Sequence, residues 1–172
     1  MAKIGMFYGS TTGNTETAAD LIKQEFDKLD SNVVEVFNVA DGPINKMVDF
    51  DYLILGGSSW GDGELQDDWN DVWDQMDEMD FRGKKVALFG LGDQFGFSDT
   101  FQDALKLMAD KVKELGGELV GLWPNEGYEF DDSAALVGDK FLGLSLDEDN
   151  QSDLTPQRVE AWVSQLKEEF GL

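Results

Sequence analysis

The sequence predicts a three-layer α/β fold in which a doubly wound parallel sheet of five strands is covered by helices on both faces. Short apolar runs alternate with longer segments whose apolar residues recur at helical spacing, from one end of the chain to the other. This strand–helix repetition is typical of parallel sheets. The 172 residues show neither a linker nor an internal repeat, so we expect one domain covering residues 1–172.

The individual elements follow from these two periodicities. Strands are expected at residues 4–8, 33–37, 52–55, 86–89 and 118–123. Amphipathic helices are expected at residues 14–29, 65–76 and 101–115, and Gly116 is expected to end the third of them. In the last helix we expect Thr155 as the N-cap, Pro156 at the first position and Phe170 at the end of the buried face.

One segment interrupts the alternation. The chain is polar from Pro124 to Lys140, and residues 141–146 then have the pattern of a strand again. We therefore expect the fifth strand to be interrupted by an inserted loop. Long loops without secondary structure are uncommon in compact domains and are often functional.

The composition excludes several kinds of chemistry. The chain has no Cys and no His, so it forms no disulfide and lacks the usual ligands of iron–sulfur, zinc and haem sites. Redox chemistry would need an organic cofactor. A formal charge of −23 should repel nucleic acid and anionic membranes, and it serves either solubility alone or docking to a basic partner. Without a leader-like start or a membrane-length apolar run, we expect a soluble cytoplasmic protein.

The most informative motif is Gly9-Ser10-Thr11-Thr12-Gly13-Asn14-Thr15, between the first strand and the first helix. Free N–H groups at a helix start, together with hydroxyl donors, form a cradle suited to a phosphate monoester. The segment has neither the lysine of a P-loop nor a G-x-G-x-x-G fingerprint. The alternative interpretation is an ordinary capping turn.

Two further glycine-rich segments follow strands three and four, where open α/β sheets bind ligands. They are 56–63 and 90–97, and each carries an aromatic residue, Trp60 and Phe97 respectively. These two rings could flank a flat ligand. By contrast Trp69, Trp73 and Trp162 occupy helix positions expected to pack in the core.

Together the three segments resemble the flavodoxins, and the tail from Leu146 to Leu172 with the inserted loop resembles the long-chain subclass of cyanobacterial type. The resemblance implies strand order 2-1-3-4-5, for which flavodoxin is itself the standard example. It also implies non-covalently bound FMN, no metal, and a monomer that acts as a low-potential one-electron carrier in place of ferredoxin, in photosynthesis for instance, rather than as an enzyme.

The resemblance also implies which residues bind FMN. The phosphate would lie against Ser10 to Thr15, one side of the ring against Ser59 to Gly63 and the other against Gly92, Asp93 and Phe97, with Asp149 near the ribityl chain. The full implied set is Ser10, Thr11, Thr12, Gly13, Asn14, Thr15, Ser58, Ser59, Trp60, Gly61, Asp62, Gly63, Leu91, Gly92, Asp93, Phe97, Gln102 and Asp149.

Three positions depart from the family pattern. Asn14 stands where many relatives have Lys, Phe97 where they usually have Tyr, and Gly61-Asp62 where they have a bulkier pair. These departures concern the tuning of the redox potentials rather than the choice of cofactor.

Two other functions would require features that this sequence lacks. A response-regulator receiver would need an acidic pocket after strand one, where this chain has Tyr8-Gly9-Ser10. A flavin-dependent NAD(P)H:quinone reductase would need room over the flavin, which Trp60 and Phe97 should close.

For an electron carrier, the resemblance implies basic-faced partners such as ferredoxin–NADP reductase, photosystem I or ferredoxin-dependent reductases. They would dock on the acidic run between Asp62 and Asp80, which has no Lys or Arg.

Overall fold

The structure is a computed structural model that describes residues 3–42, 44–60 and 63–172. Its main sheet contains the parallel strands β2 (Val34–Asn38), β1 (Ile4–Tyr8), β3 (Tyr52–Trp60) and β5 (Lys85–Leu91), side by side in that order. Two short strands share the fifth position: β6 (Glu118–Val120) pairs with Lys85 to Ala87, and β10 (Leu144–Leu146) pairs with Phe89 to Leu91. The expected order 2-1-3-4-5 and the interrupted fifth strand are confirmed.

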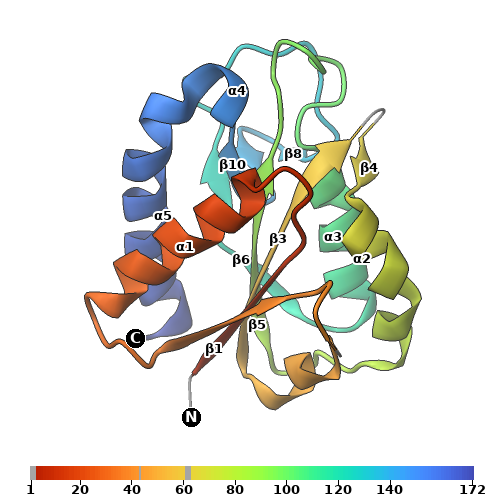
Figure 1. Cartoon of the computed structure of the whole chain (residues 1–172), viewed down its shortest axis with the longest axis vertical. Helices are drawn as coiled ribbons and strands as arrows, with labels where there is room; N and C mark the ends of the chain where they lie inside the picture. The colour runs from red at the N-terminus through yellow and green to blue at the C-terminus, as the bar shows by residue number, and fades with distance from the viewer. Residues whose placement is uncertain (1–2, 43, 61–62) are drawn as a thin grey trace.

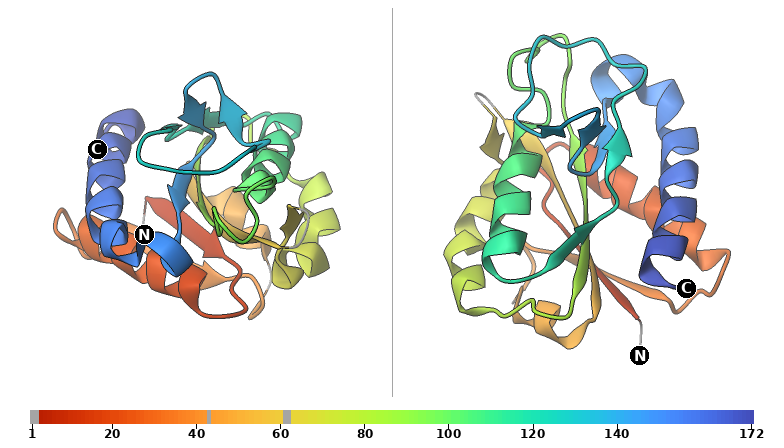
Figure 2. Two further views of the ribbon diagram at one scale, coloured as in Figure 1. Left: turned by 90° about the horizontal axis from the view of Figure 1, so that it is seen from above. Right: turned by 180° about the vertical axis from the view of Figure 1, so that it is seen from behind.

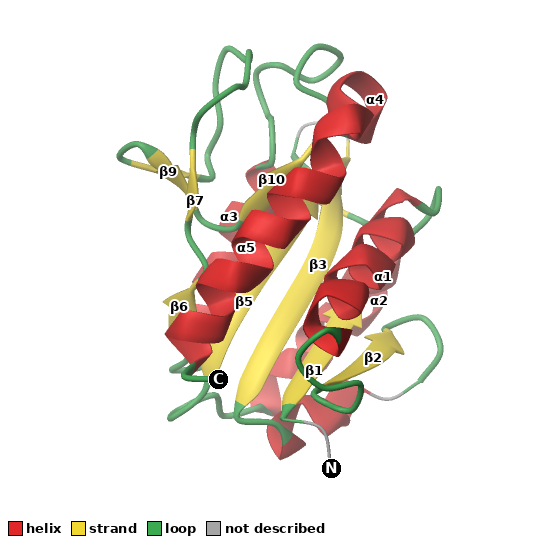
Figure 3. Cartoon of the chain, turned by 90° about the vertical axis from the view of Figure 1, so that its left-hand side faces the viewer, coloured by secondary structure: helices red, strands yellow, loops and turns green. Residues whose placement is uncertain are grey.

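Helices cover both faces of this sheet (Figure 1). The helices α1 (Asn14–Asp27) and α5 (Thr155–Phe170) lie on one face, and α2 (Asp67–Val72) and α3 (Asp103–Glu114) lie on the other. Figure 3 shows α1 and α5 running side by side over the strands. One apolar core, which includes Ile22 and Trp162, lies beneath α1 and α5, and a second, which includes Trp69 and Met108, lies beneath α2 and α3.

The inserted segment is not the structureless loop that the sequence suggested. It forms a small antiparallel sheet from β7 (Trp123–Pro124), β9 (Lys140–Phe141) and β8 (Leu136–Val137). The flanking strands are shorter than expected: β6 ends at Val120, before Gly121 at a φ of 75°, and β10 begins only at Leu144. Between β9 and β10 the backbone passes so close to β5 that a Cβ on Gly143 would lie 2.3 Å from the Leu88 carbonyl oxygen.

Tertiary contacts also shift three helix boundaries. Leu65 belongs to β4 (Glu64–Leu65), which pairs with the end of β3, so α2 starts at Asp67 and passes into a 3-10 helix at Trp73–Glu78. The helix α1 stops at Asp27 and leaves Leu29 52% exposed. Phe101 precedes α3, because Gln102 has a φ of 62° that interrupts the helical path.

Of the two helix ends expected from the sequence, the end of α3 is confirmed and the N-cap of α5 is wrong. Thr155 is not the N-cap of α5: the chain is already helical in α4 (Glu148–Gln151) and a 3-10 turn at Ser152–Leu154, and the Thr155 hydroxyl donates to Glu148. Pro156 does lie in the first turn. Gly116 ends α3 as expected, at a φ of 92°, and the N–H of Gly117 donates to the Val112 carbonyl over 2.9 Å.

A 3-10 helix at Ile44–Asp49 connects β2 to β3. Within the ranges described, no helix combines the length and the apolar character that crossing a membrane requires. The carboxyl ends of β1, β3, β5 and β10 meet at one edge of the sheet, where α4 and the inserted segment also lie (Figure 2).

Candidate functional site

A cavity of about 230 Å³ opens at the carboxyl edge of the sheet. Its lining comes from the β1–α1 loop with the first turn of α1, the end of β3, the end of β5 with the segment after it, and the start of α4. The lining residues are Thr12, Asn14, Thr15, Ser58, Ser59, Trp60, Leu91, Gly92, Asp93, Phe97, Glu148 and Asp149. All of them except Glu148 belong to the set that the sequence predicts for FMN.

The β1–α1 loop presents an open helix start to this cavity. Gly13 is the N-cap of α1 at a φ of 92°, a conformation that favours glycine. The Ser10 hydroxyl accepts the N–H of Gly13 over 3.1 Å, so part of the loop is a capping turn, which is the alternative interpretation. However, among the described residues no side chain caps α1 itself. Its first N–H groups therefore remain available for an anion.

Trp60 forms one wall of the cavity. The strand β3 continues through 56–59, where the sequence suggested a loop, and β4 pairs with Ser59 and Trp60. The indole is 41% exposed, and its Nε1 donates to the Ser58 hydroxyl over 2.6 Å. The Ser59 hydroxyl accepts the N–H of Ala104 over 2.9 Å, which joins this wall to the start of α3.

Not every residue predicted near Trp60 lines the cavity. Gly61 and Asp62 lie outside the described residues. Gly63 is buried at a φ of 90°, where a Cβ would lie 2.5 Å from the Cβ of Asp103. Gly63 therefore shapes the return of the chain toward α2 and α3 rather than the cavity surface.

Phe97 forms a second wall of the cavity, on a turn that Asp93 organises. The Asp93 carboxylate accepts the N–H groups of Gly96 and Phe95 over 2.8 Å and 3.1 Å. The bond from Gly96 is the main reason why the pKa of Asp93 lies below its ordinary value. The Asp93 carbonyl accepts the N–H of Phe97 over 3.0 Å, and Phe97 is 49% exposed.

Gln102 is not among the residues that line the cavity. Its side chain is buried, and its amide nitrogen donates to the Leu146 carbonyl over 2.9 Å. A Cβ on Gly90 would lie 2.4 Å from the Gln102 Oε1 atom. Glycine at this position in β5 lets the glutamine pass under the strand.

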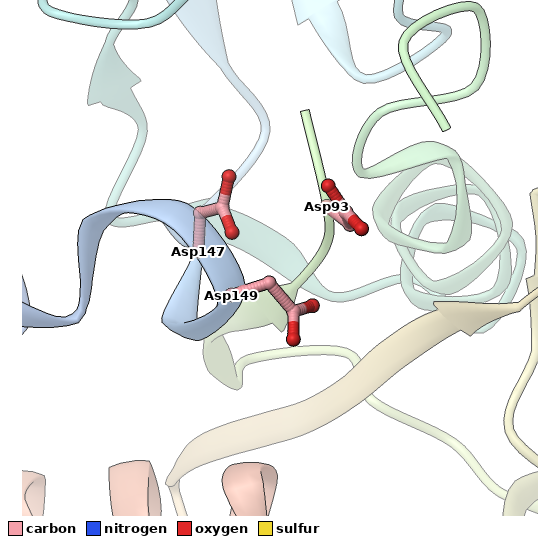
Figure 4. A group of neighbouring side chains, drawn as sticks. All are labelled: Asp93, Asp147 and Asp149. Carbon is pink, nitrogen blue, oxygen red and sulfur yellow. The ribbon is translucent and has the colours of Figure 1, made fainter. Parts of the chain in front are cut away.

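Three carboxylates, two of which line the cavity, have ligand atoms within 4.8 Å of one another. Figure 4 shows Asp147 and Asp149 at the start of α4 and Asp93 on the segment after β5. Amide groups already occupy this cluster: the Asn150 Nδ2 atom donates to Asp93 over 2.8 Å and to Asp147 over 2.9 Å, and Gln94 donates to Asp147 over 2.8 Å. The carboxylates of Asp93 and Asp147 are thereby satisfied by hydrogen bonds without a cation.

Comparisons with known proteins agree on one family. The Flavodoxin family profile matches residues 6–162. A flavodoxin from Synechococcus elongatus is 50% identical over 172 residues, 100% of both chains, and one from Nostoc sp. is 49% identical over 170 residues, 99% of this chain and 98% of the relative. The chain belongs to the flavodoxin family.

Solved structures extend the match to three dimensions. A crystal structure of Fusobacterium nucleatum flavodoxin bound to flavin mononucleotide is 35% identical, with a TM-score of 0.91, covering 98% of this chain and 99% of that one. Flavodoxins are electron-transfer proteins and not enzymes, and the full-length cyanobacterial relatives agree with the expected long-chain type. Nothing in these comparisons supports the quinone reductase.

Glu148 is the cavity residue that the sequence analysis missed. It is half-buried at the start of α4 and accepts the hydroxyl of Thr155. Its only signal in the sequence was its position next to Asp149. Burial, followed by repulsion from Asp93 and Asp147, raises the pKa of Asp149 above its ordinary value. This end of the cavity thus already disfavours negative charge.

Proposed function

We propose that the chain acts as one domain that holds FMN in the cavity at the carboxyl edge and carries single electrons at low potential. The observation that supports it best is the joining of a hydroxyl-rich, uncapped helix start to two half-exposed aromatic walls in one cavity. The Fusobacterium nucleatum relative, at 35% identity over nearly the whole chain, is bound to flavin mononucleotide.

The residues at the helix start fit a phosphate monoester. Residues 10–15 contain no charged side chain, so the N–H groups of the first turn and the hydroxyls of Ser10, Thr11, Thr12 and Thr15 would hold the phosphate. A Cβ on Gly13 would meet nothing within 4 Å, so space does not require glycine there. The φ of 92° does, because a residue with a side chain would be strained in that conformation.

The two walls fit a flat ring. Trp60 and Phe97 each leave nearly half of their surface exposed although both are large aromatics, and hydrogen bonds in the chain hold each of them in place. Bound FMN would supply one-electron chemistry at this position. The walls would exclude water from the faces of the ring and leave the cavity mouth open to a partner.

The charges around the cavity favour a low potential. Asp93, Glu148 and Asp149 line it, and the phosphate loop has Asn14 where a lysine would have supplied a positive charge. A carboxylate about 8 Å away opposes added negative charge by roughly 2 kcal/mol at an effective dielectric constant of ~20.

The partner surface that we propose is the exposed side of α2 and the 3-10 helix after it. The carboxylates of Asp67, Asp71 and Asp74 are exposed there. We propose basic-faced redox proteins such as ferredoxin–NADP reductase, photosystem I or ferredoxin-dependent reductases as partners of a cytoplasmic monomer. Complementary charge would steer the encounter more than it would strengthen the final complex.

Titration of the apoprotein with flavins tests the proposal. We expect one FMN per chain and weaker binding of riboflavin, because riboflavin leaves the donors of residues 10–15 without an acceptor. Equal affinity for the two flavins would contradict the phosphate assignment. Sustained NAD(P)H-to-quinone turnover by the isolated protein would favour the reductase instead.

A further inference from the structure

We propose that Gln66 is a positioning residue for the phosphate end of the cofactor site, because its amide fixes the hydroxyl of Thr11 as a hydrogen-bond donor toward a phosphate monoester. This inference rests on the proposed function, since it assumes that residues 10–15 hold the phosphate of FMN.

The main chain of Gln66 is fixed on both sides. Leu65 before it pairs with Ser59 of β3. The carbonyl of Gln66 accepts the N–H groups of Trp69 and Asn70 over 3.0 Å and 3.2 Å, at the start of α2. The side chain, which is only 1% exposed, therefore leaves a rigid corner between the Trp60 wall and α2 and reaches into the layer beneath the β1–α1 loop.

The amide nitrogen of Gln66 makes two hydrogen bonds. It donates to the Thr11 Oγ1 atom over 2.9 Å, across 55 positions of sequence, and to the Asp68 Oδ2 atom over 2.9 Å. The Asp68 carboxylate is only an acceptor, so it requires the nitrogen, and not the oxygen, of the amide on this side. The orientation of the amide is thus set by its neighbours.

This geometry decides what the Thr11 hydroxyl can do. A hydroxyl has one proton and two lone pairs. Once Thr11 accepts from Gln66, its own proton is left for another acceptor. Thr11 does not itself line the cavity, but it is exposed and adjoins Thr12, which does, so the free proton can turn toward a ligand held by this loop.

The second observation is a buried atom without a partner. Among the described residues nothing donates to the Gln66 Oε1 atom, which lies under Gly9, where a Cβ would come within 2.2 Å of it. A buried acceptor without a donor is unfavourable, and an apolar side chain of similar size would avoid this. The hydrogen bonds that the amide donates are therefore what distinguishes Gln66 from a core residue.

Because residues 10–15 contain no Lys or Arg, the phosphate would be bound by neutral donors alone. The direction of each donor then contributes to the discrimination between FMN and riboflavin. Losing one oriented donor should reduce this discrimination about tenfold or more, as expected for one hydrogen bond to a charged group.

The experiment measures the dissociation constants of FMN and riboflavin for the apoprotein by flavin fluorescence, with inorganic phosphate as a competitor. The variants are Gln66→Met, which keeps the size of the side chain, Thr11→Val, Thr11→Ser and the double variant Gln66→Met/Thr11→Val. Gln165→Met is the matched control, because this half-buried glutamine donates to the Leu122 carbonyl at α5, away from the loop.

We expect Gln66→Met and Thr11→Val to lower the ratio of FMN to riboflavin affinity by similar factors, and the double variant to lower it no further than either. Thr11→Ser and Gln165→Met should keep the wild-type ratio. A role in folding alone would weaken both flavins equally and leave the ratio unchanged.

Two failures are distinguishable. If the wild-type protein prefers FMN but Gln66→Met and Thr11→Val keep its full preference, the role of Gln66 is refuted and the proposed function stands. If the wild-type protein itself binds the two flavins equally and is indifferent to inorganic phosphate, the phosphate assignment and the role of Gln66 both fail. Since Thr11 is exposed, Thr11→Val should fold even if Gln66→Met does not, and an unchanged ratio in Thr11→Val alone would overturn the inference.

Discussion

At the scale of single residues, the two aromatic walls differ in size and in support. Trp60 presents an indole held by Ser58, whereas Phe97 presents a smaller ring held only through its backbone. We predict that Trp60→Ala weakens FMN binding to the apoprotein more than Phe97→Ala does, by about threefold to tenfold. Isothermal titration would measure this.

The control for this pair is Leu107→Ala on α3, where a side chain 43% exposed lies outside the cavity lining. It should leave FMN affinity unchanged. Equal losses in the Trp60 and Phe97 variants would mean that the larger stacking surface is not what matters.

Asp103 and Asp93 should affect stability in opposite directions as the pH changes. Burial is the main cause that raises the pKa of Asp103 above the ordinary value of 3.8. Its stabilising contribution is thus complete at acidic pH and is lost as the pH rises through the folded-state pKa. The pKa of Asp93 is lowered, mainly by the N–H of Gly96, so its contribution is present at neutral pH and is lost on acidification.

We therefore predict that Asp103→Asn raises, and Asp93→Asn lowers, the free energy of unfolding of the apoprotein at neutral pH. The Asp103 difference should shrink as the pH falls through the raised pKa of Asp103, and the Asp93 difference should shrink below pH 3.8, as the pH falls through the lowered pKa of Asp93. Urea unfolding at several pH values would measure them, with the exposed Asp139→Asn as the control. Changes of the same sign in both variants would contradict the environments described for these carboxylates.

At the scale of elements, the inserted segment is anchored through Tyr128. Its hydroxyl donates to the Ser145 carbonyl of β10 over 2.5 Å and accepts the indole N–H of Trp123 over 2.9 Å. The guanidinium of Arg158 lies 4.2 Å from the centre of the same ring. Burial raises the pKa of Tyr128 to about 12, so the phenol stays protonated at neutral pH.

We predict that Tyr128→Phe lowers the free energy of unfolding by about 1–3 kcal/mol, because it leaves the Trp123 N–H and the Ser145 carbonyl without this partner. Amide hydrogen exchange should accelerate in 123–141 more than in α1. The control is Tyr52→Phe, since that ring stacks on Phe170 and has no described hydroxyl bond. Equal effects of the two substitutions would show that the phenol does not anchor the segment.

Local patterns predicted the order and number of the main elements because each of them has its own periodicity. They failed where a distant segment decides the outcome. Leu65 has the spacing of a helix residue but pairs with Ser59, and Gly143 breaks the expected strand because it must pass close to Leu88.

The same difference between local patterns and distant contacts holds for the residues of the cavity. Its glycine-rich loops are visible in the sequence because turns and helix starts need particular residues nearby in the chain. Gln66 and Glu148 were not recognised as site residues. They reach the site because β4 and α4 return to the carboxyl edge of the sheet, and no local sequence pattern indicates such a contact.

At the scale of the whole molecule, the negative charge is unevenly compensated. Two carboxylates of the acidic run have cationic partners, Asp77 with Lys111 and Asp80 with Arg82. Asp68 accepts from Gln66. The exposed carboxylates of Asp67, Asp71 and Asp74 have no ion-pair partner within the described part of the chain. They belong to α2 and the 3-10 helix after it, and α2 lies on the side of the sheet opposite α5 (Figure 1).

This arrangement predicts that α2 steers the encounter with a basic redox partner. The triple variant Asp67→Asn, Asp71→Asn, Asp74→Asn changes the formal charge from −23 to −20, since three of the 36 acidic residues are neutralised, and it leaves the Gln66–Asp68 bond intact. Exposed charges are screened over about 8 Å at physiological salt. We therefore expect electron transfer to a basic reductase, followed by stopped flow at low salt, to slow about tenfold and to lose most of its salt dependence, while FMN affinity stays nearly constant.

A control variant makes the same charge change on the opposite layer and so separates local steering from net charge. It is Asp153→Asn, Glu160→Gln, Glu168→Gln. If both triple variants slowed transfer equally, only the total charge would matter. If neither did, docking would have to use another surface, and the inserted segment at 124–140 would be the next to test.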